Sequence, residues 1–198
     1  MNHAFTILGL VVLIVFVGAF VVFNKKADAP EALDLEKEKS SMSLTLTSPA
    51  FEEGSPIPSR FTCDAENISV PLTITGVPEG TQSLVLVMDD PDIPQEVKEA
   101  RGIEKFNHWA VYNIPPDTTV LKEGEVIGSQ GLNSRGEEGY AGPCPPDAPH
   151  RYFFRLYALS GTLNFIKAPT LDELEEAAKG SMIEATTLMG TYNRINNI

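Results

Sequence analysis

The apolar residues of this 198-residue chain follow two patterns, one at the start and another in the remainder. Ala4 to Phe23 is an almost wholly apolar run that contains no charged residue. At about 1.5 Å of rise per helical residue, twenty residues span roughly 30 Å, the thickness of a bilayer core. A core helix of a soluble domain would normally carry a polar face. The run therefore predicts a transmembrane anchor or signal-anchor at residues 1–24.

The segment after this run has no apolar periodicity until residue 43. Residues 25–42 mix Lys, Asp, Glu, Ala, Pro and Ser, with isolated apolar residues at Leu33 and Leu35. Such a segment has little to bury, so the composition predicts a flexible linker. From Ser43 onward, prolines and glycines separate short apolar runs. This punctuation predicts one folded domain at residues 43–198.

Several runs in this domain have the length and composition of β-strands. Leu44–Thr47 alternates apolar and polar residues, as a half-buried strand does. Ser83–Met88 is a continuous run rich in Val and Leu, which is typical of a strand buried on both faces. The other predicted strands are Trp109–Ile114, the aromatic-rich Arg151–Leu159, and Ala185–Tyr192.

One helix is predicted late in the chain. Thr170 and Glu173 form a T-x-x-E capping box, apolar residues follow at helical spacing, and Gly180 ends the pattern. Strands dominate and helices are few. This pattern predicts a mainly β fold, an antiparallel sandwich with peripheral helices.

The charge balance excludes some classes of partner. The net charge is −12, and residues 43–198 alone hold 22 acidic and 11 basic residues. Nucleic-acid binding and general attraction to anionic lipid need clustered Lys and Arg, which the sequence lacks. We expect no nucleic-acid partner, and any anion site in this domain must depend on local groups.

The two cysteines, Cys63 and Cys144, lie far apart and share no CxxC spacing. A structural zinc site would require about four Cys or His ligands, so this reading is weak. A single disulfide, which would indicate an oxidising compartment, and two buried thiols both remain open.

Reactive side chains concentrate in three places. Residues 89–94 (DDPDIP) end a strand with three acids and two prolines, residues 107–109 (NHW) begin another strand, and residues 139–151 (GYAGPCPPDAPHR) form a proline-rich loop. Each has a simpler interpretation: a solvated acidic turn, a partly exposed histidine, and a rigid connector. Residue types alone do not decide between these interpretations.

The three motifs in this order resemble the phosphatidylethanolamine-binding protein family, in its bacterial and archaeal, Raf kinase inhibitor-like branch. DDPDIP, NHWAVYNIP and GYAGPCPPDAPHRYFFRLYAL carry the resemblance, with FTCDAENISVPL and LMGTYNR, over residues 43–194. It implies antiparallel sheets with Greek-key connections and a small pocket for phosphate-like or acetate-like groups. Carried over to this chain, the ligand-binding residues are Asp90, Asp92, His108, Pro143, His150 and Tyr152.

The implied residues suit the binding of one anionic group. A carboxylate such as Asp90 can keep a nearby imidazole cationic, and the imidazole then binds the anion. Tyr152 can donate its O–H. The charged segment from Gln95 to Phe106, expected as a loop, would border the pocket. A site of this size suits a phosphoryl group better than a whole lipid.

The sequence therefore predicts a non-catalytic binding module without a cofactor. One alternative is a protein that inhibits or regulates a protease or kinase. A second is a hydrolase or metal-dependent enzyme using the Asp/His cluster, although neither G-x-S-x-G nor H-E-x-x-H occurs. A tethered binding domain with a Cys63–Cys144 bridge favours an extracytoplasmic location. Lys25 and Lys26 argue for the opposite orientation through the positive-inside rule.

Overall fold

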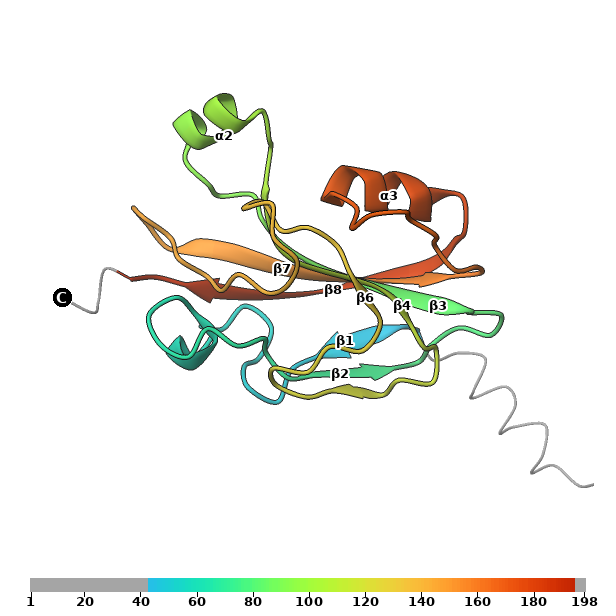
Figure 1. The fold of residues 1–198 in the computed structure, drawn as a ribbon. Helices are drawn as coiled ribbons and strands as arrows, with labels where there is room; N and C mark the ends of the chain where they lie inside the picture. The colour runs from blue at the N-terminus through green and yellow to red at the C-terminus, as the bar shows by residue number, and fades with distance from the viewer. Residues whose placement is uncertain (1–42, 195–198) are drawn as a thin grey trace, which may run out of the picture.

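The computed structural model describes residues 43–194, which form a mainly β domain with two α-helices (Figure 1). The predicted anchor at 1–24 and linker at 25–42 lie outside the described residues. Within the described residues, no helix is long and apolar enough to span a bilayer. The elements are β1 (Thr45–Thr47), the 3₁₀ helix η1 (Ser59–Phe61), β2 (Leu72–Thr75), β3 (Ser83–Asp90), α2 (Gln95–Arg101), β4 (Phe106–Ile114), β5 (Val120–Leu121), β6 (Ser129–Gln130), β7 (His150–Leu159), α3 (Leu171–Lys179) and β8 (Met182–Tyr192).

The strands form two antiparallel sheets that face each other across a shared core. A three-stranded sheet has the order β1-β2-β5, and a five-stranded sheet has the order β6-β4-β3-β7-β8. Apolar residues of both sheets, such as Ile74 of β2 and Leu86 of β3, are fully buried in one cluster. The antiparallel, mainly β architecture predicted from the sequence is confirmed.

The central strand β3 is buried along its whole length because both of its faces are covered. One face lies in the core between the sheets, and the other packs against α3, which lies above the large sheet in Figure 1. Val85 and Val87 meet Leu174 of α3 in this second cluster. The predicted capping box of α3 is present, since the Thr170 side chain accepts a hydrogen bond from the Glu173 backbone and is reciprocated.

Two expectations around the first acidic motif were wrong. The strand does not end at Met88 but continues through Asp89 and Asp90, so these acids belong to β3 rather than to a solvated turn. The segment expected as a loop contains α2, which starts directly after Pro94 and ends at Gly102 in the left-handed conformation (φ 63°). A proline before a helix and a glycine after it are ordinary helix boundaries.

A β-bulge in β4 takes His108 out of the regular alternation of the strand. Trp109 pairs with Met88 and Asn107 with Asp89, so His108 is an extra residue on β4. Regular pleating would send His108 to the face opposite Trp109. A bulge re-aims a side chain, and here it leaves His108 on the side of the sheet that carries Tyr152.

The packing around Gly190 of β8 predicts an overpacked variant. A Cβ added at Gly190 would lie 2.7 Å from Cγ1 of Ile57 and 2.8 Å from Cε2 of Phe51, both buried. We expect Gly190→Ala to lower the free energy of unfolding by about 1–3 kcal/mol, because a full core cannot accept another methyl group. Urea denaturation measures this. In the matched control Gly161→Ala, the new Cβ meets nothing within 4 Å. Equal destabilisation of both variants would show that overpacking around Gly190 is not the cause.

Candidate functional site

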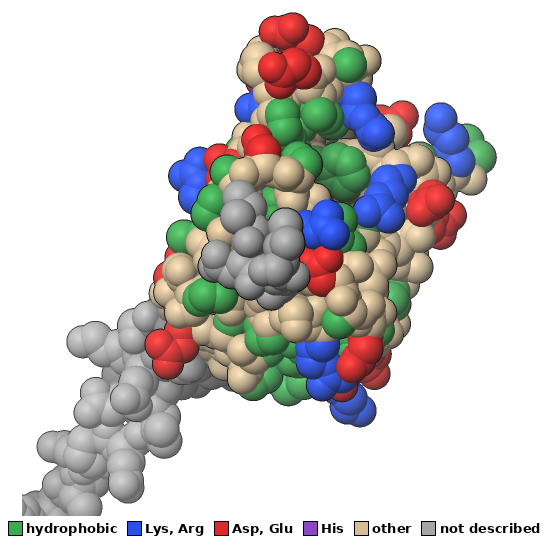
Figure 2. Space-filling view, turned by 90° about the vertical axis from the view of Figure 1, so that its left-hand side faces the viewer, with side chains coloured by type: hydrophobic (Ala, Val, Ile, Leu, Met, Phe, Trp, Pro, Cys, Tyr) green, Lys and Arg blue, Asp and Glu red, His purple; other side chains and the backbone are tan. Residues whose placement is uncertain are grey.

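Three adjacent strands bring the sequence-predicted residues together at one end of the core. Asp90 ends β3, His108 lies in the bulge of β4, and His150 and Tyr152 begin β7. Because β3 lies between β4 and β7 in the sheet, these side chains meet on its inner side. The cluster is nearly closed to solvent, with Tyr152 fully buried and His150 2% and His108 5% exposed. Figure 2 views this end of the molecule, where Lys and Arg side chains (blue) and Asp and Glu side chains (red) are interspersed on the surface.

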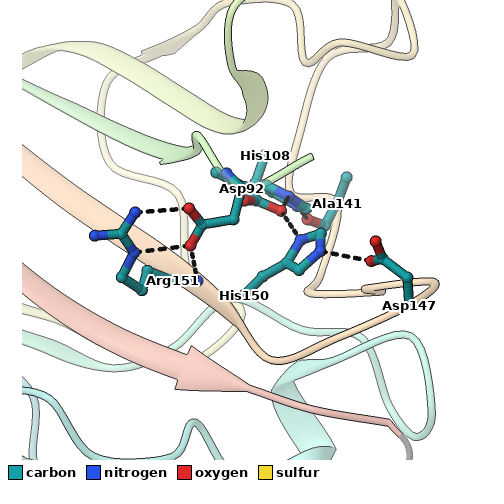
Figure 3. Close-up of polar contacts among 7 residues, drawn as sticks. Asp92, His108, Ala141, Asp147, His150 and Arg151 are labelled. Carbon is teal, nitrogen blue, oxygen red and sulfur yellow. Dashed lines mark hydrogen bonds and ion pairs between the residues drawn. The ribbon is translucent and has the colours of Figure 1, made fainter. Parts of the chain in front are cut away.

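His150 is held between two carboxylates (Figure 3). Its Nδ1 lies 2.6 Å from Oδ2 of Asp90, and its Nε2 lies 3.0 Å from Oδ1 of Asp147. Carboxylate oxygens accept, so both ring nitrogens donate and the ring is an imidazolium. Burial alone would lower the pKa of His150, but the hydrogen bonds and charges of Asp90 and then Asp147 outweigh it and raise the pKa.

Asp90 completes the ion pair from the neighbouring strand, β3. Its second oxygen, Oδ1, accepts a hydrogen bond of 2.8 Å from the backbone N–H of Asp92. Burial raises the pKa of Asp90, and the hydrogen bond and charge of His150 offset this effect only in part. Asp90 and His150 therefore bind their shared proton as one unit, since neither group is solvated enough to ionise independently.

His108 is the neutral member of the cluster. Its Nδ1–H donates to the backbone carbonyl of Ala141 over 2.5 Å. Burial lowers the pKa of His108 to about 4, although the bond to Ala141 opposes this shift. The Nε2 atom, 4.0 Å from Oδ2 of Asp90, therefore carries a lone pair and acts only as a hydrogen-bond acceptor. The idea that a carboxylate keeps a histidine cationic fits His150 and not His108.

Tyr152 contributes a buried hydroxyl without a partner. Its ring meets His108 edge-on at 5.2 Å between centroids. Its hydroxyl approaches the backbone of Cys144, yet it makes no hydrogen bond of normal geometry among residues 43–194. Burial raises the pKa of Tyr152, so the hydroxyl stays protonated. A buried O–H without a partner is uncommon in native proteins, so we expect a ligand or a water molecule to bind it.

Two further residues of the sequence prediction lie beside the cluster with other partners. Asp92 binds Arg151 through both oxygens, at 2.8 Å to Nε and 2.6 Å to Nη2, and it also accepts the Arg151 backbone N–H. These hydrogen bonds lower the pKa of Asp92. Pro143 accepts a hydrogen bond from the Cys63 backbone at its carbonyl. Asp92 fixes the start of β7 next to His150. Pro143 lies in the loop that precedes β7.

The loop that precedes β7 is fastened to the segment that follows η1. A disulfide joins Cys144 to Cys63, and the N–H of Gly142 donates to Oδ1 of Asn67. The same loop supplies the Ala141 carbonyl to His108 and the Asp147 carboxylate to His150. One anchored segment therefore sets the hydrogen bonding of both histidines.

Sequence reasoning missed several members of this arrangement. Asp147 stands three residues before His150 within the quoted loop motif, and this spacing was the available signal. The Ala141 carbonyl has no sequence signal, because any residue supplies a backbone carbonyl. Asp89 points to the opposite face, where it is fully buried and paired with Arg155 at 2.5 Å.

A separate cleft of about 590 Å³ lies on that opposite side of β4. Asn107 lines it together with residues of the α2–β4 connection, of the segment 132–136 and of the start of α3. The cleft includes none of Asp90, His108, His150 and Tyr152. Strand β4 therefore borders the histidine cluster on one face of the sheet and this cleft on the other.

The architecture defines a class of protein: a two-sheet antiparallel domain with a buried Asp–His–His–Tyr cluster at one end of its core. A family model described as phosphatidylethanolamine-binding protein matches residues 47–193. The chain therefore belongs to the phosphatidylethanolamine-binding protein family, and the resemblance inferred from the three motifs is confirmed.

Relatives in bacteria and archaea share the whole domain. A UPF0098 protein of Chlamydia pneumoniae is 47% identical, covering 76% of this chain and 99% of the relative. One from Methanothermobacter thermautotrophicus is 43% identical with the same coverage. A Chlamydia trachomatis structure, described as a phosphatidylethanolamine-binding protein homologue, is 45% identical with a TM-score of 0.74, over 78% of this chain and 99% of that one. Escherichia coli YbcL is 27% identical with a TM-score of 0.67, over 76% and 98%.

The opposite environments of the two histidines predict opposite titrations. We expect His150 to stay protonated above the ordinary value near 6.5 and His108 to stay neutral until about pH 4. Between pH 6.5 and 4 the unfolded chain binds a proton that folded His108 does not bind. His108 therefore lowers the free energy of unfolding by up to about 3 kcal/mol as pH falls through this window.

The raised pKa of His150 acts in the other direction, since its stabilisation is present below pH 6.5 and is lost as pH rises through the folded value. ¹H–¹⁵N NMR of the imidazole rings during a pH titration measures both histidines. His3→Gln removes the third histidine of the chain and simplifies assignment. Two rings titrating together near pH 6.5 would contradict the geometry.

Proposed function

We propose that this protein is a non-catalytic binding module whose Asp90–His108–His150–Tyr152 cluster holds one small phosphate-like anion. The observation that carries the proposal is the buried, unpartnered hydroxyl of Tyr152 next to the imidazolium of His150. An anion oxygen would accept from the Tyr152 hydroxyl and, in place of Asp147, from the Nε2–H of His150. Hydrogen bonds that involve a charged group are about twice as strong as neutral ones. Family membership supports a ligand-binding role for the fold.

The neutral state of His108 further restricts which ligands fit the cluster. Its Nε2 lone pair and the Asp90 carboxylate both face the cluster as acceptors. A ligand with only acceptor oxygens would place its negative charge against these two acceptors and would form no hydrogen bond with either. The monoanion of phosphate or of a phosphate monoester carries a P–OH that can donate to His108. We therefore propose a protonated phosphoryl group as the preferred ligand.

The enclosure of the cluster limits the size of the ligand. All four residues are at most 5% exposed, so the cluster offers little room for a ligand. A headgroup fits this constraint and a whole lipid does not. The non-catalytic role is part of the proposal: both cysteines are joined in the disulfide, so in the oxidised chain no thiol is present to act as a nucleophile with a histidine.

Replacing the tyrosine hydroxyl tests the proposal. We expect Tyr152→Phe to weaken binding of inorganic phosphate about tenfold, because one hydrogen bond to the anion is lost. The variant should keep or slightly gain stability, since the hydroxyl has no described partner to lose. Calorimetric titration of phosphate and thermal melting measure both effects.

Tyr112→Phe is the matched control, because Tyr112 is a buried tyrosine on the opposite face of the same sheet. It should bind phosphate like the wild type. Absence of phosphate binding by the wild type at millimolar concentrations, or equal affinity in Tyr152→Phe, would refute the proposal.

We also propose that the domain is tethered outside the cytoplasm. The disulfide suits an oxidising compartment. In Figure 1 the described chain enters at the end of the sandwich opposite the start of β7, so a tether there leaves the site free.

Trypsin added to intact spheroplasts is therefore expected to cut at the linker lysines, such as Lys37 and Lys39, and to release the domain. Immunoblotting against the domain measures the release, and lysed cells provide the control. Full protection of the chain in intact spheroplasts, with cleavage only after lysis, would place the domain in the cytoplasm.

A further inference from the structure

Asp147 is the solvent-facing member of the group around His150. Its side chain is 55% exposed, whereas that of His150 is 2% exposed. Since Nδ1 of His150 already donates to Asp90, the Nε2–H is the remaining donor of the ring, and Asp147 accepts it. Figure 3 shows the Asp147 carboxylate beside the ring of His150, joined to it by a dashed line. The Asp147 carboxylate thus lies where an anion arriving from solvent would bind the imidazolium.

The loop presents this carboxylate with little conformational freedom. Asp147 lies between Pro146 and Pro149, whose rings fix their φ angles, and the disulfide at Cys144 anchors the segment to Cys63, after η1. A preorganised group loses little entropy on binding. A ligand on a short tether also acts at an effective concentration in the millimolar range. An external carboxylate must therefore exceed this concentration to replace Asp147.

We propose that Asp147 is a specificity-determining residue, an internal carboxylate that occupies the Nε2–H of His150 until an anion with additional hydrogen bonds displaces it. This inference rests on the proposed function. A phosphate monoanion can accept from His150 and Tyr152 and donate to His108, which exceeds the single bond that Asp147 makes. Acetate can accept from His150 and Tyr152 but has no O–H to donate to His108, so it gains less over the tethered Asp147 than the phosphate monoanion does. The site thereby selects phosphoryl groups over simple carboxylates.

Removing the internal carboxylate tests this selection. The full chain is titrated with inorganic phosphate and separately with sodium acetate, with the imidazole ¹⁵N resonances of His150 as the readout. The wild type should bind phosphate and show no binding of acetate at 1–10 mM, the order of the effective concentration of the tethered group. In Asp147→Ala, phosphate affinity should rise about tenfold and acetate should bind, because a charge-assisted hydrogen bond no longer competes. Asp147→Asn keeps the size of the side chain and should show a smaller gain.

The matched control is Asp117→Ala. Asp117 is likewise an exposed acid, and it follows the far end of β4, roughly 20 Å of strand from His108. It removes the same charge from the acidic domain and should change neither affinity. A gain in this variant equal to that in Asp147→Ala would assign the effect to net charge and overturn the inference.

The outcomes separate the inference from the proposed function. If Asp147→Ala binds phosphate more weakly than the wild type or with equal affinity, Asp147 only orients His150 and the inference fails, while a loss of binding in Tyr152→Phe would still support the phosphate site. Acetate binding by the wild type with the affinity of phosphate would also overturn it. If neither the wild type nor Asp147→Ala binds phosphate, both proposals fall. Phosphate binding only in Asp147→Ala would refute the proposed function for the wild type, and with it the displacement of Asp147 by phosphate.

Discussion

The hydrogen-bonded ion pair between Asp90 and His150 is the interaction on which the whole site depends. Its two atoms lie 2.6 Å apart at a place where both residues are 2% exposed. Burying two charges is costly, and removing one partner of such a pair typically destabilises a protein by about 3–5 kcal/mol. The neighbouring contacts follow from this cost. The Asp92 amide satisfies the second oxygen of Asp90, and Asp147 satisfies the second nitrogen of His150.

The ion pair also explains why the two histidines differ. His150 is charged because two carboxylates flank it. His108 meets a backbone carbonyl at Nδ1, and within residues 43–194 no carboxylate lies within hydrogen-bonding distance of it. Within the same cluster, His150 of β7 thus provides a positive charge and His108 of β4 provides a lone pair. A cluster with two imidazolium rings would attract any anion. The observed mixture of donors and acceptors matches the protonated phosphoryl group that we propose as the ligand, since that group carries both.

Much of this arrangement could be predicted from the sequence, and the missing parts have identifiable causes. The continuous run of Ser83–Met88 predicted a strand buried on both faces, and the capping box at Thr170 predicted α3, because these patterns report local geometry and burial. The grouping of Asp90, His108, His150 and Tyr152 came from the family resemblance, since no local pattern encodes which strands are neighbours. The bulge at His108 reversed the expected alternation, and neither it nor the partner of Asp147 follows from residue types.

The strands and the loop before β7 have different roles in this site. The strands hold the ion pair and the tyrosine in positions set by sheet register, which side-chain changes at the surface cannot move. The loop contributes the Ala141 carbonyl and the Asp147 carboxylate, and it is fixed by the disulfide rather than by sheet pairing. Loops on a rigid scaffold tolerate substitution more readily than the scaffold does. Ligand selection can therefore change through residues such as Asp147 while the buried Asp90–His150 pair stays intact.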